Sequence, residues 1–204
     1  MGTPLIFGLP DAVEIGGVIH PIRTDFRIGI KFEQLFTENE GLDESEQMTV
    51  LVKALRLWYP KPPRNIPEAI DKMLWFYGCG DKKTDAQGET SGARLYDLKH
   101  DETYLHAAFL TQYDIDLYRD NLHWWTFCSL FKALDDCRLT QIIGYRGIKI
   151  DPKHMTKAEQ EFYTKMKKRY ALPLPEADQQ RIDELEAALM SGKGIDEALA
   201  KQKR

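Results

Sequence analysis

Apolar residues recur at helical spacing along most of the chain, and a pattern typical of β-strands is confined to a short region near the N-terminus. In "AVEIGGVIHPI", two short apolar runs flank a Gly-Gly pair, which suits the positive φ angles of a tight hairpin turn. We expect strands near 12–15 and 18–22. A helix capped by Thr24 or Asp25 follows and continues to about Phe36.

Two helices with well-defined apolar stripes are predicted next. Asp43, with Glu46 three residues later, forms a capping-box pattern, and "PKPPRN" ends that helix as a stiff connector. Pro67 suits the first turn of the following helix. The apolar positions are Met48, Leu51, Val52, Leu55, Trp58 and Tyr59 in the first stripe, and Ile66, Ala69, Ile70, Met73, Leu74 and Tyr77 in the second.

Trp75 and Phe76 lie off the second stripe. Either this helix is buried on more than one side or it presents aromatic surface, and burial is the more frequent fate of large aromatic side chains. A polar, glycine-punctuated loop, "GCGDKKTDAQGETSGAR", follows the helix. Loops of this length are either functional or disordered, and we expect disorder here.

Two helices are predicted between about residues 97 and 134, the second capped by Asn121. Neighbouring residues on a helix point about 100° apart, so Trp124 and Trp125 cannot both face one seam. We therefore expect this helix to be covered on two sides and to be central. "TQIIGYRGI" predicts a short helix or turn, and "MTKAEQEFYTKMKKRYAL" predicts a charged helix whose sparse stripe is Phe162, Met166 and Tyr170.

These elements together predict a mainly α protein. Its expected parts are an N-terminal β-hairpin, a compact multi-helix bundle and a protruding C-terminal helical tail. We divide the chain into a hairpin and helical core domain, residues 1–150, and a charged helical extension, residues 151–204. The end of the extension has a thin apolar stripe at Ile182, Leu185 and Leu189.

Length and composition fit an ordinary globular protein of one domain, or of one domain with an appendage: 204 residues, 43% hydrophobic and 29% charged. The net charge of −4 gives no overall attraction to nucleic acid. Cys79, Cys128 and Cys137 are odd in number and widely spaced, which favours a reducing compartment. No apolar run approaches the roughly 20 residues that cross a bilayer, and the N-terminus is unlike an export signal. We expect a cytoplasmic protein that does not associate with membranes.

The sequence contains only weak signals for a metal site, a catalytic site or a nucleic-acid-binding site. His123 and Cys128 are five residues apart, a poor match to one helix face for a metal site, and no local signature supports a nucleophile pair. "GCGDKKTDAQG" follows a helix rather than a strand and lacks the spacing of a phosphate-binding loop. "LTQIIGYRGI" faintly resembles the turn of a helix-turn-helix, but the surrounding charge is wrong for a duplex binder. We therefore predict an interaction protein with no catalytic residue, cofactor or metal.

Four segments resemble a known family: the hairpin leading into "TDFRIGIKFEQLF", the helix closing in "WFYGCGD", "YDLKHDETYLHAAFLTQYDIDL" and "LHWWTFCSLFKALDDCRLTQIIGYR". In that order, over about 13–170, the chain is similar to the "gene product fifteen" family of siphophages and of prophages of Gram-positive bacteria. The stretch from "LHWW" to "IIGYR" is the most specific part.

The resemblance implies a tail-assembly chaperone. Such a protein would bind the tape-measure protein in the host bacterial cytoplasm, leave as tail-tube subunits assemble, and be absent from the mature virion. The major tail-tube protein and a second copy of this chain are further candidate partners, and no nucleic acid is expected. Two alternatives stay open: a structural tail-completion or connector protein of the virion, and a small DNA-binding regulator.

A tape-measure protein is expected to be long and helical, with exposed apolar stripes that aggregate when unpaired. A helical chaperone can cover such stripes in grooves between amphipathic helices. For the three aromatic candidates the alternative is burial in the core, and for the three tail candidates it is docking on their own domain. The candidate contact residues are Trp75, Phe76, Trp125, Ile182, Leu185 and Leu189.

Overall fold

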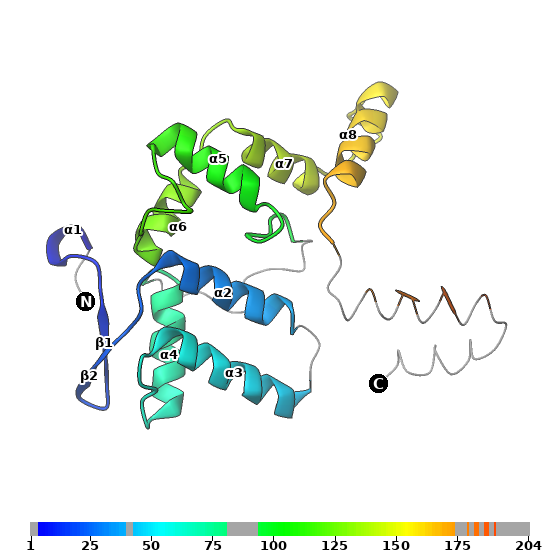
Figure 1. Ribbon diagram of the computed structural model, residues 1–204. Coiled ribbons are helices and arrows are strands. Elements are labelled where there is room, and N and C mark those ends of the chain that lie inside the picture. Colours follow the sequence, from blue (N-terminus) through cyan, green and yellow to red (C-terminus); the bar gives the residue numbers. More distant parts are fainter. Residues whose placement is uncertain are drawn as a thin grey trace.

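The computed structural model describes residues 4–39, 43–80 and 94–173, and within the C-terminal segment the positions 179, 182, 183, 186, 187 and 190. This part of the chain is mainly helical, with one antiparallel hairpin near the N-terminus, as the sequence predicts (Figure 1). In chain order the elements are α1 (Pro4–Phe7), β1 (Ala12–Ile15), β2 (Val18–Pro21), α2 (Phe26–Thr37), α3 (Glu44–Trp58), α4 (Ile66–Tyr77), α5 (Glu102–Tyr113), α6 (Trp124–Lys132), α7 (Arg138–Gly147) and α8 (Lys157–Arg169).

The hairpin forms where the Gly-Gly pair predicts it, and β2 ends one residue before the expected end. Ile15 lies opposite Val18, directly beside the turn. Gly16 and Gly17 have φ angles of 57° and 76°, so the turn uses left-handed backbone that glycine adopts without steric cost. The Gly16 amide donates a hydrogen bond to Glu68 Oε2 at 2.9 Å, which holds the turn against α4.

Side-chain caps fix the starts of α2 and α3 at the predicted residues. The Asp25 carboxylate accepts a hydrogen bond from the Arg27 amide at 2.8 Å. Asp43 and Glu46 form the expected capping box, each side chain accepting a hydrogen bond from the other residue's amide. Both caps satisfy amides that the first helical turn leaves without a partner.

The start of α6 corrects one prediction, because its cap is His123 and not Asn121. His123 Nδ1 accepts a hydrogen bond from the Trp125 amide at 3.1 Å. Asn121 lies two residues before the cap, and its side-chain oxygen accepts a hydrogen bond from Arg27 at 3.3 Å. Asparagine is the commoner capping residue, but here a contact with a distant arginine occupies its side chain.

The buried face of α3 differs from the predicted stripe. Met48 and Val52 were expected to face the core and are exposed, whereas Val50 and Ala54 are buried. Helix α3 packs against both α2 and α4, so two neighbours set the direction of its buried arc. The remainder of the stripe is buried or half-buried, namely Leu51, Leu55, Trp58 and Tyr59.

Both tryptophans of α6 are buried, which confirms a helix covered on two sides. Their indole Nε1 groups donate to the last carbonyls of α4, Trp124 to Tyr77 at 2.8 Å and Trp125 to Phe76 at 2.7 Å. Helix ends leave such carbonyls without an intrahelical partner, so the pair caps α4. The Trp124 ring also occupies the space beside Gly29 of α2, where an added Cβ would lie 2.1 Å from its Cε3.

Phe127, on the next turn of α6, lies at the centre of the aromatic core. Its ring stacks on Phe26 of α2 and on Phe109 of α5, with centroid distances of 5.0 and 5.3 Å. Helix α6 therefore connects the group formed by α2, α3 and α4 to α5, as the arrangement in Figure 1 shows.

A buried ion pair joins α7 to the start of α5. Arg146 donates to both carboxylate oxygens of Asp101, at 2.6 and 2.8 Å, and its Nε donates to the Tyr170 carbonyl at the end of α8. Burial alone would raise the pKa of Asp101. The hydrogen bonds from Arg146 and from the Asp97 amide, and the positive charge of Arg146, outweigh the effect of burial. They hold the pKa of Asp101 below its ordinary value.

Helix α8 packs on α7, and none of its residues is fully buried (Figure 1). Its cap is a Thr156–Glu159 capping box. The proposed division of the chain near residue 150 stays a prediction. Across the described ranges, no helix is both long and apolar enough to span a bilayer.

Candidate partner-binding surface

The first described residues form an exposed apolar arm. Leu5 is 99% exposed and Phe7 is 75% exposed, and Ile6 and Leu9 between and beyond them are exposed as well. We call residues 4–9 the N-terminal arm. A helix of one turn cannot bury these side chains by itself, so the arm offers apolar surface for a contact elsewhere.

The arm is attached to the body at its C-terminal end. His123 Nε2 lies 2.9 Å from the Pro10 carbonyl oxygen. Because Nδ1 of the same ring accepts a hydrogen bond from the Trp125 amide, Nε2 carries the proton and donates to Pro10. The neutral imidazole thus joins the base of the arm to the start of α6.

The edge of the hairpin continues this apolar surface. Val18 is 57% exposed and Ile19 66% exposed on β2. The arm and the hairpin lie along the same side of the molecule, at the left of Figure 1. An exposed apolar strand edge invites contact with another chain.

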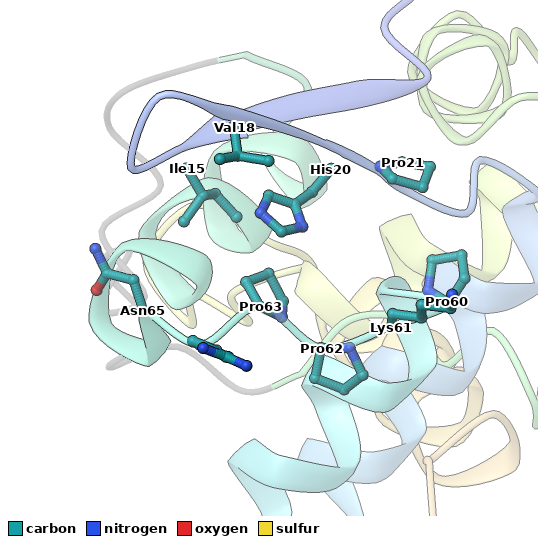
Figure 2. Close-up of a pocket in the computed structure, with 10 residues that line it drawn as sticks. Ile15, Val18, His20, Pro21, Pro60, Lys61, Pro62, Pro63 and Asn65 are labelled. Atoms are coloured by element: carbon teal, nitrogen blue, oxygen red, sulfur yellow. The ribbon is translucent and has the colours of Figure 1, made fainter.

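A groove lies between the hairpin and the connector from α3 to α4, and its volume is about 680 Å³. Figure 2 shows Ile15, Val18 and His20 directed from the hairpin toward the proline-rich connector. The opposite wall consists mainly of Pro60, Pro62 and Pro63. We call this hollow the hairpin groove.

The walls of the hairpin groove are held in place before any partner arrives. Arg23 Nη1 donates to the carbonyls of Arg56 and Leu57 at 2.7 and 2.9 Å, which caps the end of α3. The prolines fix the backbone φ of the connector, and Pro63 is buried. A preformed groove loses little conformational entropy on binding, which favours affinity.

Charge on the rim of the hairpin groove is basic. Lys61 and Arg64 are exposed on the connector side. The described lining residues include no aspartate or glutamate. An apolar segment flanked by acidic residues would complement this surface better than one flanked by basic residues.

The structure places the aromatic residues predicted to contact a partner mostly inside the protein. Phe76 is fully buried and Trp125 is buried. Trp75 is half-buried and packs edge-to-face on Trp125, with ring centroids 5.3 Å apart. The sequence left burial open as the alternative, and burial describes Phe76 and Trp125. Contact of any of the three with a partner is untested.

The tail candidates divide between described and undescribed positions. Ile182 is in the described part of the chain and is exposed, whereas Leu185 and Leu189 lie outside the described residues. The expected stripe can therefore be placed at one position only. Its role as a partner contact stays a prediction.

Sequence reasoning missed both the N-terminal arm and the hairpin groove. The arm does carry a signal, because "PLIFGLP" has four large apolar residues between two prolines and is too short for a core helix. The groove has no comparable signal, since it combines residues 15–21 with residues 60–65. Within the described ranges, His, Cys, Asp and Glu side chains form no group of three that could hold a metal ion.

One family model matches the chain. Its description is "Bacteriophage Gp15 protein", and the match covers residues 6–172. It therefore includes the hairpin groove and all of the N-terminal arm except Pro4 and Leu5. No curated protein and no solved structure matches the chain significantly.

Proposed function

This chain belongs to the bacteriophage Gp15 family, which indicates a phage structural or assembly protein, and from that premise we propose that it is a tail-assembly chaperone. Its partner in this proposal is the tape-measure protein, which it binds in the host cytoplasm. It then leaves as the tail tube assembles and is absent from the mature virion. Its action is binding alone, with no covalent chemistry.

The observation that carries this proposal is the apolar N-terminal arm beside the hairpin groove. A long helical partner with apolar stripes needs cover for those stripes until assembly. The arm supplies exposed apolar anchors such as Leu5 and Phe7, and the groove supplies a preformed apolar site. Together they support a helix-in-groove or arm-on-helix contact.

The size of this surface suits a partner that must be released. Interfaces below about 1,200 Å² of total buried area belong to weak and transient complexes. We expect an arm of six residues and one groove to bury an area of that smaller class. A chaperone that tail-tube subunits displace needs such a modest affinity.

The test is co-expression with the tape-measure protein of the same phage, the long helical product of the neighbouring gene. We expect the tape-measure protein to be more abundant in the soluble fraction with the chaperone than without it, and to co-purify with it. A variant with Leu5→Ser and Phe7→Ser should bind at least tenfold more weakly, since each apolar anchor contributes on the order of 1–2 kcal/mol.

Leu110→Ser is the matched control, because Leu110 is an apolar side chain exposed on α5, outside the arm and the groove. It should behave as wild type. If the tape-measure protein is no more soluble with the wild-type chain and the two do not co-purify, the chaperone proposal is wrong. If the wild type binds and the arm variant binds equally well, the function stands and the assigned surface is wrong.

A second candidate function is a structural subunit of the tail, such as a completion or connector protein. The observation that favours it is that one chain carries both an apolar arm and an apolar groove, as a head-to-tail contact between identical copies requires. Mass spectrometry of purified virions separates the two functions. Many copies per tail would support the structural subunit and contradict the chaperone.

A further inference from the structure

The end of α4 places a cysteine where a glycine would be expected. The Gly80 amide donates to the Trp75 carbonyl at 2.9 Å, and the Cys79 amide donates to the Phe76 carbonyl at 3.1 Å. These two hydrogen bonds form a Schellman motif, in which the residue after the cap adopts left-handed backbone and is usually glycine. Here that residue is Cys79, with φ of 58°.

A side chain at this position has a steric cost, because its Cβ crowds the backbone in left-handed conformation. In the described ranges, Asp114 is the one other non-glycine residue with positive φ. Glycines flank Cys79 on both sides, so the turn itself does not demand a cysteine. A residue kept in a strained conformation points to a role for its side chain.

The Cys79 thiol meets a second thiol. It makes a side-chain hydrogen bond with Cys128 on α6, and it lies 3.8 Å from the Tyr77 carbonyl oxygen. Both cysteines line one cavity of about 250 Å³, with Glu33, Tyr96 and Lys132 among its other walls. Both residues are half-buried, so neither is sealed in the core.

The third cysteine is separate from this pair. Cys137 caps α7, and its sulfur accepts a hydrogen bond from Thr140 Oγ1 at 3.6 Å. It does not line the cavity that Cys79 and Cys128 share. The three thiols therefore divide into an adjacent pair and a single residue that serves as a control.

The resting state of the pair is the dithiol. The hydrogen bond with Cys79 raises the pKa of the Cys128 thiol, and burial raises it further, so Cys128 stays protonated at neutral pH. Attack by the thiolate is the first step of disulfide exchange. Cys128 is accordingly disfavoured as the group that first attacks an external disulfide.

We propose that Cys79 and Cys128 are an oxidation site, at which a low-molecular-weight disulfide such as oxidised glutathione converts the adjacent thiols into an intramolecular disulfide. The Cys79 thiolate attacks one sulfur of oxidised glutathione, forms a mixed disulfide and releases one glutathione thiolate. Cys128 then loses its proton and attacks the Cys79 sulfur. The mixed disulfide breaks, and a second glutathione thiolate leaves. Two protein thiols are oxidised, and one external disulfide is reduced to two thiols.

The cross-link would tie the C-terminal end of α4 to the middle of α6. It would close a loop of the chain that includes α5. The cross-link itself would lie near the end of α4, where the indoles of Trp124 and Trp125 donate to the last carbonyls of that helix. Cross-links across long loops restrict the unfolded chain and stabilise the fold when native geometry allows them. The oxidised protein should therefore unfold at a higher temperature than the reduced protein.

The test uses the purified full chain, equilibrated in a series of oxidised and reduced glutathione ratios and then treated with N-ethylmaleimide. We expect intact-mass spectrometry to show one N-ethylmaleimide adduct in place of three, together with the loss of two hydrogen atoms, and peptide mapping to show a Cys79–Cys128 cross-link with Cys137 alkylated. Dithiothreitol should reverse the change. Cys137→Ser should form the same cross-link, whereas Cys128→Ser should stop at a glutathione adduct on Cys79.

Cys79→Gly keeps the experiment decisive, because glycine suits the left-handed position and this variant should fold at least as stably as the reduced wild type. It should form no intramolecular disulfide under any of the ratios and should show no oxidative rise in unfolding temperature. The proposal is overturned if the wild type keeps two alkylatable thiols at Cys79 and Cys128 in oxidised glutathione alone. It is equally overturned if the cross-link involves Cys137 or a second molecule.

Discussion

Arg146→Met tests how α5, α7 and α8 are held together. The guanidinium donates to both Asp101 oxygens, to the Leu95 carbonyl at 3.1 Å and to the Tyr170 carbonyl at 2.6 Å. Methionine retains an unbranched apolar stem but donates no hydrogen bond. The variant leaves the Asp101 side chain, which is 2% exposed, with a hydrogen bond from the Asp97 amide at 3.1 Å and no cation.

The expected loss of unfolding free energy is about 3–5 kcal/mol, because removing one partner of a buried ion pair leaves an uncompensated charge. That is a large share of the roughly 5–15 kcal/mol that stabilises an ordinary domain. The double variant Asp101→Leu with Arg146→Met removes the charge as well. We expect it to recover at least half of the loss, although the carbonyls of Leu95 and Tyr170 still lack their donor.

Acidification should change the stability contributed by Asp101 in opposite directions in the wild type and in Arg146→Met. In the wild type the pKa of Asp101 is held below its unfolded value of about 3.9, so the pair stabilises the fold above that pH and its contribution is lost as pH falls through the folded pKa. Without Arg146, burial raises the pKa of Asp101. The variant then gains a proton and recovers stability as the solution is acidified.

Urea unfolding followed by tryptophan fluorescence, at pH 7 and at pH 4, measures both effects. The stability gap between wild type and Arg146→Met should be smaller at pH 4 than at pH 7. A loss below about 1 kcal/mol at pH 7, the value of an exposed ion pair, would refute the reasoning. So would a gap that widens in acid.

Two further predictions concern α2 and α7. Gly29→Ala should lower the unfolding free energy by about 1–3 kcal/mol, because the Cβ of the new alanine would clash with the Trp124 ring. Gly144→Ala is the control: a Cβ there meets open space, so this variant should be neutral or more stable by up to about 1 kcal/mol. Equal effects of the two substitutions in thermal unfolding would contradict this reasoning. Burial raises the pKa of Glu33 despite its hydrogen bond from Tyr77, so the wild type loses stability as pH rises above about 4.3. Glu33→Gln should be the more stable protein at pH 7 in urea titrations, and an advantage that grows in acid would contradict it.

Local structure was predicted well where it depends on residues that are close together in the sequence. The Gly-Gly turn fixed the hairpin, and the Asp43–Glu46 capping box fixed the start of α3, because each interaction spans at most three residues. Predictions that depend on distant residues were weaker. Asn121 is not the cap of α6, since its side chain accepts from Arg27, which is 94 residues away.

The candidate contact residues illustrate the same limit. The sequence showed that Phe76 lies off the expected stripe of its helix and that Trp124 and Trp125 cannot both face one seam. Spacing alone could not show that Trp125 Nε1 donates to the Phe76 carbonyl and that both side chains are buried. The pairing of Cys79 with Cys128 was hidden for the same reason, because 49 positions separate the two residues along the chain.

The segments that carry the family resemblance contact one another within this protein. "WFYGCGD" supplies the Phe76 and Tyr77 carbonyls that accept from the tryptophans of "LHWW". "YDLKHDETYL" supplies Asp101, which pairs with the arginine of "IIGYR". These residues hold the helices to one another, so their presence identifies the family without identifying a ligand. Partner choice is then expected to depend on surfaces outside them, chiefly the N-terminal arm and the connector over 60–65, where all described side chains except that of Pro63 are exposed.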